Sequence, residues 1–129
     1  MRRYTLPIIA LAVLLSAAGC AHKLHPDADP VLVRAEQSLE ISFTTVDTLL
    51  LIEHQHRALL AQLVPHAEEY CDYARTVGPP SFRALDAAIT AYRDNRSPEN
   101  KATLLTWLAV VEQLARDAQV VLAAWGGGQ

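Results

Sequence analysis

The stretch that decides the fold is "SPENKATLLTWLAVVEQLARDAQVVLAAW", residues 97–125 of a 129-residue chain. Ser97 can cap a free backbone N–H, and Pro98 fits the first turn of a helix, where its missing N–H costs nothing. Glu99 adds a negative charge where the helix dipole favours one. Apolar side chains then recur in steps of three and four and share one face: Leu104, Trp107, Leu108, Val111, Leu114, Ala115, Ala118, Val121, Leu122 and Trp125. The pattern predicts an amphipathic helix, followed by residues 126–129 as a flexible tail.

A second helix start stands at Asp29-Pro30, where an aspartate able to cap precedes a proline. One seam continues from there in steps of three and four, and it consists of Leu32, Ala35, Leu39, Ser42, Val46, Leu49, Glu53, His56, Leu60, Leu63, Ala67, Tyr70 and Ala74. Most of these side chains are apolar or aromatic, which favours a long amphipathic helix over a strand. Further apolar residues at positions 50–52 widen the surface, so we expect this helix to contact more than one neighbour.

Proline divides this helical region. Pro65 falls inside the seam, where it removes a hydrogen bond and clashes with the preceding turn, so we expect either a kink or two helices meeting end to end. The Gly-Pro-Pro sequence at 78–80 is expected to end the element, and a shorter helix should follow at about 81–94. No strand pattern competes. The sequence therefore predicts an all-α fold, an antiparallel three-helix bundle with a long, possibly Pro65-kinked first helix, formed by residues 30–125.

The N-terminus has the layout of a secretory signal peptide. Arg2 and Arg3 give it a positive start, residues 6–15 give it an apolar core, and "LLSAAGC" leads from small residues into Cys20. The apolar segment is shorter than the roughly 20 residues that a membrane-spanning helix needs. We therefore expect this segment to be cleaved from the mature protein.

The end of this segment resembles the lipobox of bacterial lipoproteins. Residues 17–20, Ala-Ala-Gly-Cys, match it, although the family more often has leucine where Ala17 stands. The resemblance implies that residues 1–19 are removed and that Cys20 carries a covalent lipid, which would be the only attached group. It also implies a cell-envelope protein held on the membrane. Since Ala21 is not aspartate, the resemblance places it on the periplasmic face of the outer membrane in a Gram-negative host.

The expected lipidation of Cys20 also limits what the remaining cysteine, Cys71, can do. Residues 20–29 are expected to form the lipidated cysteine and a tether, which would leave Cys71 without an intramolecular disulfide partner. Cys71 is then either a small buried apolar residue or the site of a disulfide between chains. Trp125, near the end of the last helix, is a second candidate for an interface with a partner.

The charge balance narrows the class of partner. Removing Arg2 and Arg3 takes the basic residues from 11 to 9 against 14 acidic residues, so the mature chain has a net charge of about −5. No run of five or more basic residues occurs anywhere in the sequence. Nucleic acid is therefore not an expected partner, and we expect a protein partner or self-association.

The polar interruption in "LLLIEHQHRALL", residues 49–60, is the strongest candidate for chemistry. Glu53 and His56 have the Glu-x-x-His spacing by which one helix of a di-iron bundle supplies two ligands, but no second Glu-x-x-His occurs in the chain. Three hypotheses stay open for the role of Glu53, His54 and His56. They could bind one metal ion at an edge, form a polar layer that sets the register of the bundle, or simply face water. Arg57 lies four residues after Glu53, the favourable order for a helical ion pair.

No pattern points to catalysis. The sequence has no nucleophile elbow and no glycine-rich phosphate loop. We therefore expect a non-enzymatic, membrane-anchored envelope lipoprotein that serves as a protein-interaction or accessory module. The alternative is a metal- or small-ligand-binding bundle. The block "NRSPENKATLLTWLAVVE", residues 95–112, faintly resembles small uncharacterised helical proteins of bacteria and phages, and it implies no function.

Overall fold

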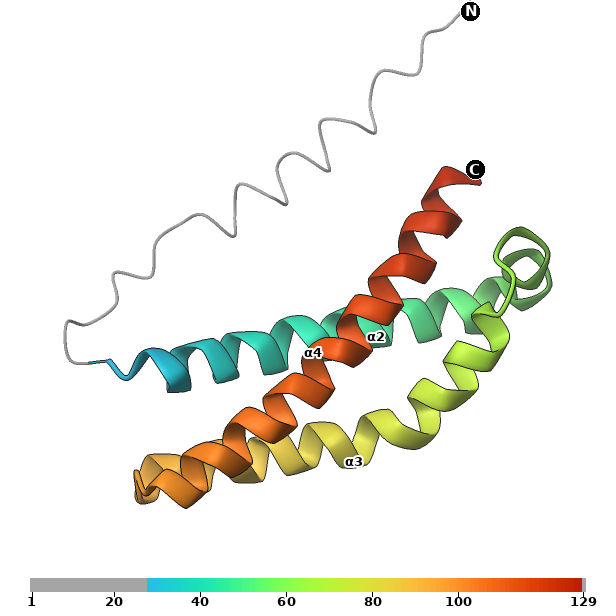
Figure 1. The fold of residues 1–129 in the computed structure, drawn as a ribbon. Coiled ribbons are helices and arrows are strands. Elements are labelled where there is room, and N and C mark those ends of the chain that lie inside the picture. The colour runs from blue at the N-terminus through green and yellow to red at the C-terminus, as the bar shows by residue number, and fades with distance from the viewer. Residues whose placement is uncertain (1–27, 129) are drawn as a thin grey trace, which may run out of the picture.

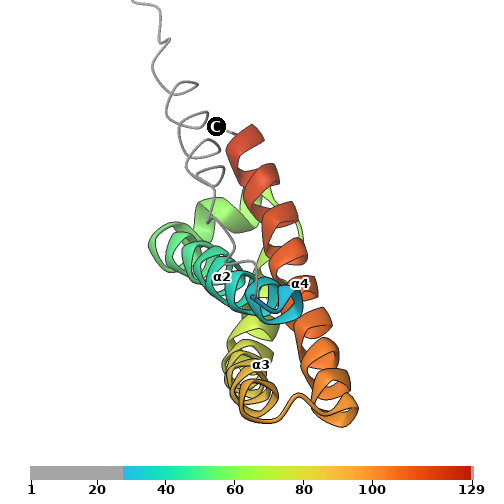
Figure 2. The same ribbon diagram turned by 90° about the vertical axis from the view of Figure 1, so that its left-hand side faces the viewer.

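The computed structural model describes residues 28–128, which form three α-helices. They are α2 (Pro30–Leu63), α3 (Ala67–Asp94) and α4 (Pro98–Gly127). Consecutive helices reverse direction, and each helix packs against the other two (Figures 1 and 2). The predicted all-α, antiparallel three-helix bundle is confirmed. The expected signal peptide and Cys20 lie outside the described residues, as does most of the expected tether.

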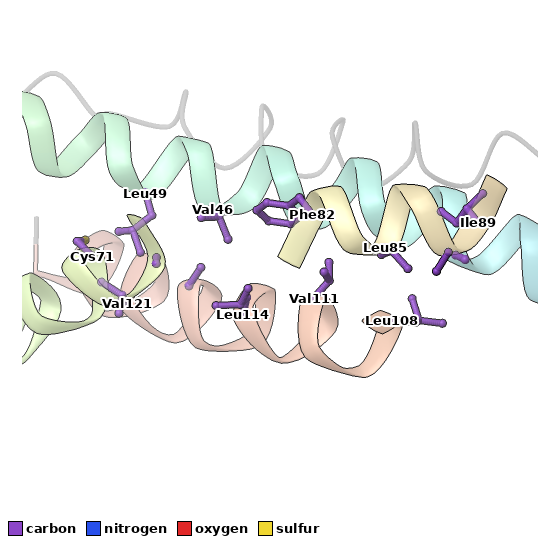
Figure 3. Packing of buried hydrophobic residues seen from close by; sticks show 14 of the residues in the cluster. Val46, Leu49, Cys71, Phe82, Leu85, Ile89, Leu108, Val111, Leu114 and Val121 are labelled. Carbon is purple, nitrogen blue, oxygen red and sulfur yellow. The ribbon is translucent and has the colours of Figure 1, made fainter. Parts of the chain in front are cut away.

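None of the helices within residues 28–128 combines the length and the apolar character that crossing a membrane requires. Instead, the long apolar faces of the helices are buried against one another. Figure 3 shows side chains from all three helices meeting in one core, among them Leu49 of α2, Leu85 of α3 and Val111 of α4. These three side chains are fully buried. Burial of one such aliphatic side chain stabilises the fold by about 1.5–3 kcal/mol.

Both predicted helix starts are confirmed by their caps. The Asp29 carboxylate accepts a hydrogen bond from the Val31 N–H at 2.8 Å, and the Ser97 hydroxyl oxygen accepts one from the Asn100 N–H at 3.1 Å. The predicted end of α4 is wrong by two residues, because the helix continues through Gly127 and closes where the Gly128 N–H bonds to the Trp125 carbonyl oxygen. Glycine weakens a helix by about 1 kcal/mol per residue but does not forbid one.

The break near Pro65 separates two helices. α2 ends at Leu63, Val64 and His66 flank the proline, and His66 has φ 67°, in the left-handed region. The chain then reverses direction, so the long first helix does not continue through Pro65 and the end of the predicted seam belongs to α3. The kink within α2 lies at His56, whose φ of −132° and ψ of 30° are not helical. Beyond it the end of α2 turns out of line with the rest of the helix (Figure 1).

The expected helix end at residues 78–80 is wrong, because α3 runs unbroken through Gly78, Pro79 and Pro80. Both prolines are exposed, so the carbonyl groups that lose a helical partner can face water. Gly78 has no Cβ, which removes part of the clash that a following proline imposes on a helical residue. The opposite face of α3 stays buried from Ala74 to Leu85, and this packing stabilises the helix across the two prolines. The helix is bent along its length (Figure 1).

Candidate functional site

Glu53 is a buried carboxylate at the centre of an ion-pair cluster between α2 and α3. Only 2% of its side chain is exposed. One oxygen, Oε1, lies 3.4 Å from the Arg57 guanidinium, and the other, Oε2, accepts a hydrogen bond from Arg75 of α3. Arg57 also pairs with Glu68 at 2.5 Å, and Arg75 pairs with Asp72 at 2.9 Å. We call these five residues the Glu53 cluster.

The Glu53 cluster connects α2 to α3, and the carboxylate at its centre is shielded from solvent. Among residues 28–128, Oε1 of Glu53 has no hydrogen-bond partner although it is buried. Cys71 lies in the same environment, and burial together with the negative charge of Glu53 raises the pKa of its thiol to about 11. Of the two arginines that contact Glu53, Arg57 lies one turn further along α2, whereas Arg75 reaches it from α3. The predicted Glu53–Arg57 pair is confirmed, and Arg75 is the partner that the sequence did not reveal.

The structure separates the three residues that the sequence grouped as a ligand site. Glu53 faces the core, whereas His54 and His56 are exposed. The expected place of His56 on the buried seam is therefore wrong, and its ring stacks on Trp125 of α4 with 5.7 Å between ring centres. Within residues 28–128 no group of three or more His, Cys, Asp or Glu side chains is placed to hold a metal ion.

Neither of the two predicted interface residues is available to a partner in this arrangement. Cys71 is fully buried in the core, which agrees with its interpretation as a small apolar residue and leaves no exposed sulfur for a disulfide between chains. Trp125, in the last turns of α4, is also buried, and the His56 ring lies against it. The sequence places Trp125 near a free end, but in the structure the His56 ring of α2 stacks on it.

A hollow on the described surface forms a groove between α2 and α3. It consists of two adjoining parts, of about 430 and 170 Å³, which share Phe43 and Phe82. We call it the α2–α3 groove. Its lining comprises Glu36, Leu39, Glu40, Phe43, Thr44, Val46, Asp47 and Leu50 of α2 with Ala74, Gly78, Pro79, Phe82, Arg83, Asp86, Ile89 and Arg93 of α3.

Phe43 is the most prominent apolar side chain in this groove. Its ring meets the edge of the Phe82 ring, with 5.5 Å between centres and 74° between planes. Phe82 is buried, but Phe43 remains 55% exposed. An aromatic ring that is anchored on one side and open on the other offers apolar contact area at little cost in side-chain entropy. The wall of the groove therefore presents a fixed apolar feature to solvent.

The rim of the groove is mainly acidic. Its charged side chains are the acids Glu36, Glu40, Asp47 and Asp86 and the bases Arg83 and Arg93. Four acids and two bases give a net charge of −2. Glu36 and Arg93 pair with each other from opposite walls. Within the described part of the chain, Glu40 and Asp47 have no ion-pair partner, and neither does Arg83.

This groove was not predicted from the sequence. Its one sequence signal is Phe43, a large aromatic residue one place after the seam position Ser42 and therefore off the core-facing side. Such a residue is common on protein surfaces and does not by itself indicate a site. Only its position opposite α3 makes it part of a groove.

A comparison of the chain with protein-family models, with curated proteins and with solved structures finds no significant match.

Proposed function

We propose that this protein is a non-enzymatic lipoprotein of the bacterial cell envelope that binds another protein through the α2–α3 groove. The observation that carries the proposal is the half-exposed Phe43 ring, fixed against Phe82 in a groove that crosses the face of two helices. Apolar grooves rimmed by charged side chains are typical sites for protein partners.

The proposed location rests on the lipobox-like residues 17–20, which end at Cys20. A short tether would connect the lipid to the capped start of α2 and hold the bundle close to the membrane surface. The groove begins about two turns into α2, at Glu36, so it would lie near the membrane and within reach of other envelope proteins.

The anchor and the groove can be tested separately in the native host. Cys20→Ala should move the protein out of the membrane fraction and abolish lipid labelling. If the Cys20→Ala protein stays in the membrane fraction, the lipoprotein assignment is wrong.

For the groove, a photo-reactive amino acid replaces Arg83, an exposed residue of the lining. The matched control carries it at Arg116, an exposed arginine of α4 outside the groove. Irradiation of cells should give one defined crosslink to an envelope protein from position 83 and none from position 116. Phe43→Ala should remove this crosslink, whereas Ile41→Ala, which truncates an equally exposed side chain outside the groove, should leave it. Equal crosslinking from positions 83 and 116 would refute the proposal.

A further inference from the structure

We infer that the α2–α3 groove binds a cationic amphipathic α-helix of another protein. This inference rests on the proposed function, and it specifies the chemistry of the partner through the shape and the charge of the groove.

The length of the groove suits a helix. Along α2 the lining runs from Glu36 to Leu50, which is about 20 Å at 1.5 Å per residue. A helix of about 14 residues has the same length and can place apolar side chains at every third or fourth position along it. Phe43 lies near the middle of this distance, so one central apolar residue of the partner would pack against its open face.

The charges select a basic partner over a second copy of the chain. Two copies facing each other through this groove would bring a net charge of −2 against −2, with Glu40 and Asp47 present on both sides. Like charges at an interface oppose association. The mature chain as a whole is also acidic, with 14 acids against 9 bases once residues 1–19 are removed. A partner with lysine or arginine beside its apolar stripe would pair with carboxylates that have no ion pair within residues 28–128.

The spacing of these carboxylates also predicts a pattern in the partner. Glu40 and Asp47 are seven residues apart, two turns or about 10 Å along α2, with Phe43 between them. A helix lying along α2 would match both carboxylates with two basic residues that are themselves seven apart, and would place an apolar residue between them. The ion pair between Glu36 and Arg93 joins the two walls of the groove, so the carboxylates left to pair with a partner along α2 are those of Glu40 and Asp47.

The test uses three fluorescent peptides of about 14 residues and the full chain purified in a neutral detergent. The first peptide has a leucine stripe flanked by two lysines seven apart. The second has the same composition but carries both lysines on the face opposite the leucines. The third has glutamate in place of lysine. Fluorescence anisotropy should show saturable binding of the first peptide, weakened by salt, and binding of the other two that is at least about tenfold weaker.

Protein variants assign this binding to the groove. Glu40→Lys should weaken binding of the first peptide about fivefold and Glu40→Lys/Asp47→Lys about tenfold or more, because each exposed pair is replaced by repulsion. Asp94→Lys makes the same charge change at an exposed residue outside the groove and should change binding less than about twofold. Phe43→Ala should weaken binding about tenfold, with Ile41→Ala as the matched control of equal exposure.

Three results would overturn the inference. The first is equal binding of the lysine and glutamate peptides. The second is self-association in sedimentation that Phe43→Ala abolishes, and the third is binding of the protein to anionic vesicles through the groove. The second result would identify a second copy as the occupant, and the third would identify a membrane. If the peptides fail while the crosslink from position 83 persists in cells, only the predicted partner chemistry is wrong. If the crosslink is also absent, the proposed function fails with it.

Discussion

Substitutions of the arginine and of the carboxylate in the Glu53 cluster are expected to have different effects on stability. Removing Arg75 should destabilise the bundle, whereas replacing Glu53 by methionine should leave stability nearly unchanged or raise it. The reason is that the carboxylate is buried and one of its oxygens has no hydrogen-bond partner among the described residues, whereas Arg75 and Arg57 both reach solvent.

The size of each change in stability depends on which charged group stays in the protein without its partner. Removing one partner of a fully buried ion pair costs about 3–5 kcal/mol. Arg75 is 39% exposed, and Arg57 remains 3.4 Å from Oε1 after its removal, so we expect Arg75→Ala to cost about 2 kcal/mol. Glu53→Met leaves both arginines free to be hydrated and removes the desolvation cost of the carboxylate. Its effect should lie within about 1 kcal/mol of zero.

Urea denaturation of the full-length variants, followed by circular dichroism, measures both changes. Arg83→Ala is the matched control, because Arg83 is an exposed arginine of the same helix with no ion pair within residues 28–128, and it should cost less than about 0.5 kcal/mol. The double variant Glu53→Met/Arg75→Ala should be no less stable than Glu53→Met alone. If Glu53→Met destabilises the protein as much as Arg75→Ala does, the carboxylate contributes net stability and the reasoning is wrong.

Three further predictions concern the core and the cap of α2. Leu85→Ala, at a fully buried position, should lower the free energy of unfolding by about 3 kcal/mol, and a loss below about 1 kcal/mol in urea denaturation would contradict the packing described. Cys71 should react with a thiol reagent only as fast as the protein unfolds, because it is buried and its thiol has a pKa of about 11; rapid labelling of the folded protein would contradict this. Partial burial acts to raise the pKa of Asp29, but hydrogen bonds from the Val31 N–H and the Tyr92 hydroxyl outweigh it, so the pKa lies below 3.8. A lowered folded-state pKa gives stability that is present above the unfolded value and is lost as the pH falls through the folded value. Asp29→Asn should therefore flatten the fall in Tm as the pH drops below 3.8, and parallel curves for the two proteins would refute the role.

The candidate site was predictable only where its parts lie close together in the chain. The pair of Glu53 with Arg57 follows from their spacing of four, because one helical turn brings such side chains together. Arg75 is 22 residues from Glu53 and reaches it only because the turn after Leu63 folds α3 back along α2. The groove depends on the same turn, since its two walls belong to different helices.

The helical class, the starts at Asp29-Pro30 and Ser97-Pro98, and the apolar face of α4 were all predictable from local patterns, because caps and periodicity act within a few residues. Where the first two helices divide depends instead on packing between helices. Taken locally, the Gly-Pro-Pro sequence at 78–80 is the stronger helix breaker, yet α3 continues through it because its opposite face is buried against the other helices. The tertiary structure also places Glu53 in the core and His56 at the surface, where the His56 ring stacks on Trp125. The kink at His56 turns the end of α2 out of line with the rest of the helix. A local signal gives only the preference of a segment for helix, and packing between helices is strong enough to override it.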